Sequence, residues 1–195
     1  LGEVPPAILE KMEIVSQKTQ MITRLVEDII SLQKMEAVTL QLRTVTPHEL
    51  VTRARHGAVA NAAQLGIEIT SDSTPNLPKL SVDDDRIGQV FDNLVANALK
   101  FSPSGTKIHI SAEQDGDTIK FSIHDQGIGI PSHKMDKVFE RFYQVDGSTT
   151  RRYSGAGLGL AIIKQIIELH NGRITVDSVV NQGTTFSFWL PIHKE

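Results

Sequence analysis

Residues 82–123 read VDDDRIGQVFDNLVANALKFSPSGTKIHISAEQDGDTIKFSI, and they place an amphipathic helix directly before a β-hairpin. Over 82–101 the apolar residues recur at the three- and four-residue steps of one helix face. Apolar and polar residues then alternate over 108–112 and again over 119–123, with an Asp-Gly turn signal between the two runs. Helices combined with antiparallel hairpins predict an α+β two-layer sandwich.

The same reasoning extends outward from this stretch in both directions. Upstream, the pattern predicts a short strand at 40–45, a helix from Pro47 to about Leu65, a short strand at 67–69 and a loop at 71–78. Downstream, it predicts an irregular segment at 126–156 with a short helix near 134–142, a helix at 158–170, and two strands flanking Asn181-Gln182-Gly183.

Residues 1–39 predict one long helix that is separate from this α/β pattern. A heptad-like stripe follows alternating steps of four and three along it, at Ile8, Met12, Val15, Thr19, Ile22, Val26 and Ile29. One alternative is an amphipathic helix that lies on its own domain. We favour pairing outside the domain, in a coiled coil or bundle, because the helix is longer than most globular helices.

Composition excludes several classes of protein. The 195 residues carry a net charge of −3 with a pI near 6.2, which argues against a general nucleic-acid binder. Without cysteine there is no disulfide and no thiolate metal site. No apolar run approaches the roughly 18 residues that cross a bilayer, so we expect neither a membrane span nor a secretory signal. The chain begins with Leu1 rather than Met, which we expect of a piece of a longer protein.

A polar stripe on the helix at 82–101 indicates a binding site. Asn93, Asn97 and Lys100 fall on one narrow side of that helix, away from its apolar face. A solvated face is the alternative, but asparagine is a poor residue in the middle of a helix. An amide oxygen suits Mg²⁺, and the lysine charge suits a phosphate.

Asp125 ends the core-facing row of the predicted strand that begins near Ile119. A carboxylate there costs free energy unless it accepts hydrogen bonds. Backbone amides of the turn at Gly127 and Gly129 could supply them. We favour a ligand N–H such as an adenine amine, because the two glycines let a flat ring approach the backbone.

The stretch GAGLGL at 155–160 opens the predicted helix at 158–170. Glycine-rich turns at helix N-termini present N–H groups to phosphate. The segment before it reads as a mobile flap, with a plain surface loop as the alternative. Its aromatic and basic residues are Phe139, Arg141, Phe142, Tyr143, Arg151 and Arg152.

These motifs together resemble the catalytic ATP-binding domain of two-component sensor histidine kinases, in the superfamily of gyrase, Hsp90 and MutL. The similar stretches, for the N, G1, F, G2 and G3 boxes in order, are DNLVANALKFSPSG, DQGIGIP, FERFYQ, GAGLGLAI and NQGTTF. The likeness covers residues 40–195, and 1–39 are similar to the second helix of the dimerisation and phosphoacceptor domain.

The resemblance implies the Bergerat (GHKL) fold, a mixed, mostly antiparallel sheet packed on three helices, with ATP held under a flexible lid. It implies that Asn97 holds Mg²⁺, with Asn93 and Lys100 near the phosphates as the other catalytic residues, and that Asp125 accepts the adenine amine. Contacts to ATP are implied for Asn93, Asn97, Lys100, Phe101, Asp125, Gly127, Gly129, Ile130, Phe142, Arg151, Arg152, Gly157, Leu158, Gly159 and Thr184.

The implied activity is a protein-histidine kinase. The γ-phosphoryl group of Mg-ATP would pass to a histidine and then to an aspartate of a response regulator. His48-Glu49 is the only candidate acceptor motif, and we reject it because it lies after the long helix, where Pro47 suits a helix start. We therefore expect no self-phosphorylation by this chain alone.

Further expectations follow from the same likeness. They are a homodimer through the N-terminal helix in a parent protein, no nucleic-acid partner, no membrane insertion by this chain, and a cytoplasmic location, with a membrane-anchored sensor as parent. Gln144 stands where the family often has arginine, so we expect Arg151 or Arg152 to replace that lid contact.

Three other functions stay open at this point. A hydrolysing clamp like Hsp90 or MutL would carry a glutamate base where Asn93 stands, and an amide cannot take a proton from water. A non-catalytic module whose docking is controlled by nucleotide is a second alternative. A serine kinase like the anti-sigma factors is the third, although those domains lack the long N-terminal helix.

Overall fold

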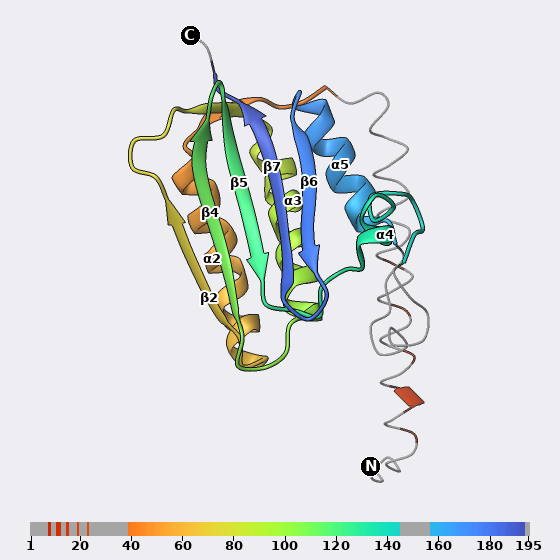
Figure 1. Ribbon diagram of the computed structural model, residues 1–195. Helices are drawn as coiled ribbons and strands as arrows, with labels where there is room; N and C mark the ends of the chain where they lie inside the picture. The colour runs from red at the N-terminus through yellow and green to blue at the C-terminus, as the bar shows by residue number, and fades with distance from the viewer. Residues whose placement is uncertain are drawn as a thin grey trace, which may run out of the picture.

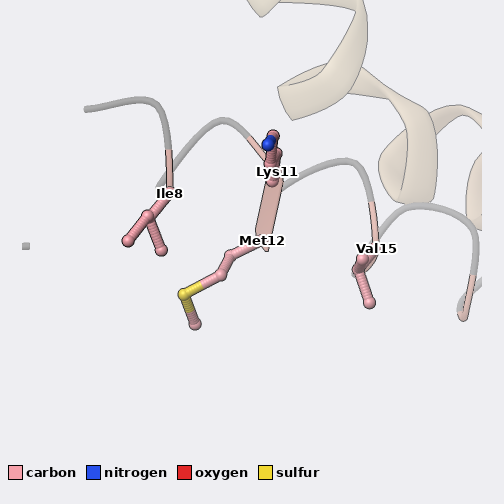
Figure 2. A pocket seen from close by; sticks show the side chains of 4 residues that line it. All are labelled: Ile8, Lys11, Met12 and Val15. Atoms are coloured by element: carbon pink, nitrogen blue, oxygen red, sulfur yellow. The ribbon is translucent and has the colours of Figure 1, made fainter. Parts of the chain in front are cut away.

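A computed structural model of the chain describes residues 39–144 and 157–193, together with Ile8, Lys11, Met12, Val15, Thr19 and Thr23. The rest of the helix predicted at 1–39 lies outside the described residues, as do Arg151 and Arg152. The six described residues of that stretch are helical and exposed. Figure 2 shows Ile8, Met12 and Val15 on the same side of the segment, which is the arrangement that the heptad steps predict.

The centre of the fold is a five-stranded sheet in the order β2-β4-β5-β7-β6. In chain order its strands are β2 (Glu68–Ser73), β4 (Lys107–Asp115), β5 (Thr118–Asp125), β6 (Arg173–Val179) and β7 (Gly183–Pro191). β2 and β4 are parallel, and every other neighbouring pair is antiparallel. The predicted hairpin at 108–123 is thus confirmed as β4 and β5.

Three helices cover one face of this sheet (Figure 1), namely α2 (Pro47–Gln64), α3 (Asp84–Phe101) and α5 (Gly159–Leu169). The core lies between the two layers. Phe91 of α3 packs edge-on against Phe121 of β5 and Phe188 of β7, with ring centres 5.5 and 5.3 Å apart. The predicted α+β two-layer sandwich is confirmed. Among the described residues, no helix has the length and apolar character of a membrane span.

Three helix boundaries confirm their sequence signals. Thr46 and Glu49 form a capping box at the start of α2, and Gly66 (φ +69°) follows its end. Asn171 (φ +56°) follows α5, and the Gly172 N–H donates to the Ile167 carbonyl oxygen over 2.9 Å.

One strand was missed, and two boundaries were predicted wrongly. β3 (Leu80–Val82) was missed; it pairs with β1 (Arg43–Val45) in a separate two-stranded sheet. Because β3 extends to Val82, α3 begins at Asp84 rather than at residue 82, with Asp83 as its N-cap. β2 continues to Ser73, where we expected a loop from 71, because its register with β4 extends to Ala112.

The short helix expected near 134–142 is α4 (Ser132–Met135), and no further helix follows it in the described residues up to 144. Beyond α4 the backbone bonds step back three residues, as from the Lys137 N–H to the Lys134 carbonyl oxygen at 3.1 Å. Such bonds make tight turns rather than α-helix.

His170 ties the end of α5 to the start of α3. Its Nε2 lies 3.0 Å from the backbone nitrogen of Asp83, and its Nδ1 lies 2.7 Å from the carbonyl oxygen of Ile166. A backbone N–H only donates and a carbonyl only accepts, so the imidazole is neutral with its proton on Nδ1. Burial is the main cause that lowers the pKa of His170; the charge of Arg86 adds to it, while the Ile166 bond and Asp83 oppose it.

We expect acid to weaken the fold through His170. Its folded-state pKa lies below the ordinary 6.5, so the unfolded chain binds more protons between the two values. The contribution of neutral His170 to the free energy of unfolding is therefore complete above about pH 6.5, and it is lost as the pH falls through the folded-state pKa. When the pH is lowered from about 7 to about 5, the free energy of unfolding measured in urea should therefore fall more for the wild type than for His170→Gln, because glutamine does not titrate. Equal losses in the two proteins would contradict this assignment.

Candidate functional site

The Asp125 carboxylate lies at the end of β5, with only 5% of the residue exposed. Its Oδ1 accepts hydrogen bonds from the backbone N–H groups of Gly127 (2.8 Å) and Thr184 (3.2 Å). Its Oδ2 has no bond to the described part of the chain. One carboxylate oxygen thus holds the turn, and the other is available to a ligand donor.

Burial raises the pKa of Asp125, while the two backbone N–H bonds and the neighbouring His124 oppose that shift. The ionised carboxylate is therefore held in the fold at a cost in stability. A costly charged group with one oxygen that makes no hydrogen bond to the described residues is typical of a functional site.

Glycines let three backbone segments converge on Asp125. A Cβ on Gly127 would lie 2.7 Å from both Asp125 Oδ1 and the Phe101 carbonyl oxygen. A Cβ on Gly129 (φ +69°) would overlap the backbone of Val179 and Val180, where β6 ends and the turn to β7 begins. These contacts require glycine for the chain's own packing, and room for a base beside them stays a prediction.

Ser178 of β6 joins the same segments and was missed from the sequence. Its Oγ accepts from the Ile130 N–H over 2.8 Å, donates to the Gly183 carbonyl oxygen at 2.9 Å and lies 2.9 Å from Thr184 Oγ1. Ile130 and Thr184, both predicted site residues, are thus held near each other. A serine inside a strand carries no local signal for this role, because the role depends on segments distant in the chain.

The stripe on α3 faces the start of α5. Asn93 donates from Nδ2 to the Gln89 carbonyl oxygen over 3.0 Å, which leaves its Oδ1 directed at α5. A Cβ added to Gly159 would lie 3.2 Å from that oxygen. The predicted asparagine stripe and the predicted glycine-rich turn therefore meet in space.

Asn97 and Lys100 lie half-buried further along the same stripe. The Asn97 side chain has no hydrogen bond to the residues that the structure describes. Burial lowers the pKa of Lys100, and its ammonium lies 5.1 Å from the ring centre of Phe101. A partly desolvated ammonium gains from a phosphate nearby.

The start of α5 presents backbone rather than side chains. Leu158, its N-cap residue, makes no side-chain capping bond, and its side chain is buried in the core. Any contact of Leu158 with phosphate can therefore come only from its backbone. The first N–H groups of a helix lack partners within the helix and carry its positive dipole end, so they suit an anion.

Phe142 and Gly157 form the base of the predicted flap. The Phe142 N–H donates to the Gly157 carbonyl oxygen over 2.8 Å, and a Cβ on Gly157 would lie 2.8 Å from Tyr143 O. Phe142 has a left-handed backbone (φ +64°) and is 65% exposed. Its predicted contact with a nucleotide stays a prediction, as do those of Arg151 and Arg152, which lie outside the described residues.

No three His, Asp or Glu side chains come together as a metal site in the described part of the chain. Mg²⁺ beside a nucleotide does not need such a cluster, because phosphates and waters supply most of its ligands.

Comparison with known proteins assigns the family. Residues 82–194, more than half of the chain, match the family described as Histidine kinase-, DNA gyrase B-, and HSP90-like ATPase. The chain belongs to this ATPase family. All the predicted site residues of this family member lie within the matched range.

Similar sequences and similar solved structures include sensor histidine kinases, which agrees with this family. The chain is 35% identical over 189 residues to "Sensor histidine kinase WalK" of Bacillus subtilis (strain 168), covering 93% of this chain and 30% of WalK. Among solved structures, full-length ShkA in complex with AMPPNP has a TM-score of 0.83 at 26% identity, covering all of this chain and 41% of ShkA. The mycobacterial sensor histidine kinase MprB has a TM-score of 0.67 at 30% identity, covering 79% of this chain and 99% of MprB. The chain thus spans under a third of WalK.

Proposed function

We propose that this chain binds ATP between Asp125 and the stripe on α3. The observation that carries the proposal is the divided bonding of Asp125, whose Oδ2 can accept the adenine amine while Oδ1 holds the Gly127 turn. The phosphates would extend toward the first turn of α5 and Lys100. The complex of the similar ShkA with AMPPNP supports this assignment.

Magnesium would be held by Asn97 together with the phosphates. The half-buried side-chain amide of Asn97 makes no hydrogen bond to the described residues, and an amide oxygen is a hard neutral ligand. When bound, the ion would neutralise phosphate charge. Asn93 and Lys100 would position the phosphates beside it.

We further propose that ATP serves phosphoryl transfer to a histidine and then to a response-regulator aspartate. The names of the sensor histidine kinase relatives support this role. Residues 40–195 would be the ATP-binding unit, and residues 1–39 part of a dimerising helix pair in a cytoplasmic region. Phosphoryl transfer depends mostly on positioning and charge stabilisation, so this unit needs no strong base.

A hydrolysing clamp remains the second candidate, and Asn93 argues against it. Its Nδ2 is engaged by Gln89, and its amide cannot accept a proton from water. We expect no steady ATP turnover by the isolated chain. Rapid phosphate release in a coupled assay would favour hydrolysis instead.

Asn97→Ala should weaken ATP binding about tenfold or more when Mg²⁺ is present, since metal affinity falls by such factors when its support is removed. Without Mg²⁺ the loss should be small. Titration calorimetry with and without the ion measures both values. Asn61→Ala, the same change at an exposed site on α2, is the matched control. An equal loss in both conditions would refute a metal role for Asn97.

A further inference from the structure

α3 and α5 run antiparallel, because the start of α5 lies beside the middle of α3 and the end of α5 lies beside the start of α3. At one end Gly159 approaches Asn93, in the proposed nucleotide site. At the other end His170 meets Asp83. His170 follows Gly159 by about three helical turns, so both residues lie on the side of α5 that faces α3.

The contact at His170 is directional. His170 is 5% exposed, and its ring is fixed by the 2.7 Å bond to Ile166 and the 3.0 Å bond from the Asp83 N–H. Sliding α5 by one residue, about 1.5 Å, would break the bond to Asp83.

Asp83 is itself firmly held. Its Oδ1 accepts the Arg86 N–H over 3.2 Å, capping α3, and its Oδ2 accepts the Gln41 N–H over 3.0 Å. The bond to His170 therefore attaches α5 to a fixed point at the start of α3.

The rest of the α5 face leaves its register less defined. Its buried side chains are apolar: Ala161, Ile162, Ile163, Ile166 and Ile167. These side chains hold α5 against the core by shape alone, and they provide no directional bond that fixes one position along its axis. At the nucleotide end there is little tolerance, because a side chain at position 159 would place its Cβ only 3.2 Å from Asn93 Oδ1.

We propose that the Asp83–His170 hydrogen bond positions the nucleotide site from its far end. It sets the register of α5 against α3, and so places the first-turn N–H groups of α5 at the right distance from Asn93 and Asn97 to share one triphosphate. His170 is a positioning residue and does not touch the nucleotide. The inference rests on the proposed function.

Two substitutions at His170 separate its two bonds. A glutamine oxygen reaches the position of Nε2, so His170→Gln keeps an acceptor for the Asp83 N–H. His170→Asn keeps a donor for the Ile166 carbonyl but is too short for Asp83. With Mg²⁺ and AMPPNP, we expect the Kd of His170→Asn to rise about tenfold and that of His170→Gln to stay within about twofold of wild type.

Urea unfolding of each variant, and AMPPNP binding by Ile119→Val, separate positioning from stability. Ile119 is buried in β5 and belongs to neither α3 nor α5, so this change tests whether a weakened core alone raises the Kd, and we expect the Kd to stay unchanged. Normal binding by His170→Asn, or an equal loss in His170→Gln, would overturn the positioning role. Failure of the wild type to bind AMPPNP would instead refute the proposed function.

A measurement on the unaltered protein does not depend on the folding of any variant. If the bond favours nucleotide binding, nucleotide must favour the bond by the same factor. Hydrogen exchange at the Asp83 amide should therefore slow about fivefold or more when AMPPNP binds, while edge amides of β2 remain unchanged. Unaltered exchange at Asp83 in a saturated complex would overturn the inference.

Discussion

Asp125→Asn is expected to lower ATP affinity at least about 100-fold while the protein stays folded. The amide oxygen can keep the two backbone bonds now made by Oδ1. The amide nitrogen then replaces Oδ2, so that a donor faces the donating amine of adenine. A site built to hydrogen-bond one group rejects a mismatched one by factors of this size or more.

Asp125→Asn should lose ATP affinity without losing stability. Burial raises the pKa of Asp125 above its ordinary 3.8, so its ionisation opposes folding once the pH exceeds the folded-state value. Removing the charge should leave the free energy of unfolding at pH 7 equal to or above that of the wild type. Urea titration measures this, and a large loss of stability would show that Asp125 is mainly structural.

Inosine triphosphate provides the chemical control, because it carries an acceptor oxygen where adenine carries its amine. The wild type should prefer ATP, and Asp125→Asn should lose that preference. Calorimetric titration of both nucleotides into both proteins gives the four affinities. If Asp125→Asn bound ATP with an affinity within about threefold of the wild-type value, the assigned contact would be refuted.

Gly183→Ala should destabilise the fold by about 2–6 kcal/mol. Gly183 has φ +109°, which L-residues avoid at a cost of about 1–3 kcal/mol. Its added Cβ would also overlap the Asp125 carbonyl oxygen and lie 3.0 Å from Gln126 Cα. These are backbone atoms, which cannot rotate away, so overpacking adds a further 1–3 kcal/mol or so.

Gly116→Ala is the matched control for that prediction. Gly116 also has a positive φ (+60°), but a Cβ there would meet nothing within 4 Å. Only the backbone cost of about 1–2 kcal/mol should appear. Urea unfolding of both variants measures the two losses of unfolding free energy. Similar losses would show that the contact of the added Cβ with the Asp125 backbone does not contribute to the destabilisation.

The sequence by itself determined the elements and the polar stripe. The α3 helix, the hairpin of β4 and β5, the start of α2 at Pro47 and the place of Asp125 at the end of a core row all followed from neighbours within about four positions. Helix and strand periodicity and capping are local properties, so a linear pattern predicts them.

Tertiary structure alone decided which segments meet. β3 exists because it pairs with β1, Ser178 joins the Ile130 and Gly183 turns, and His170 meets Asp83 across two helices. The two bonds on Asp125 Oδ1 likewise needed Thr184, which is far along the chain. Each of these contacts depends on the packing of the whole core, because no local pattern tells a serine or a histidine which distant backbone group it will face.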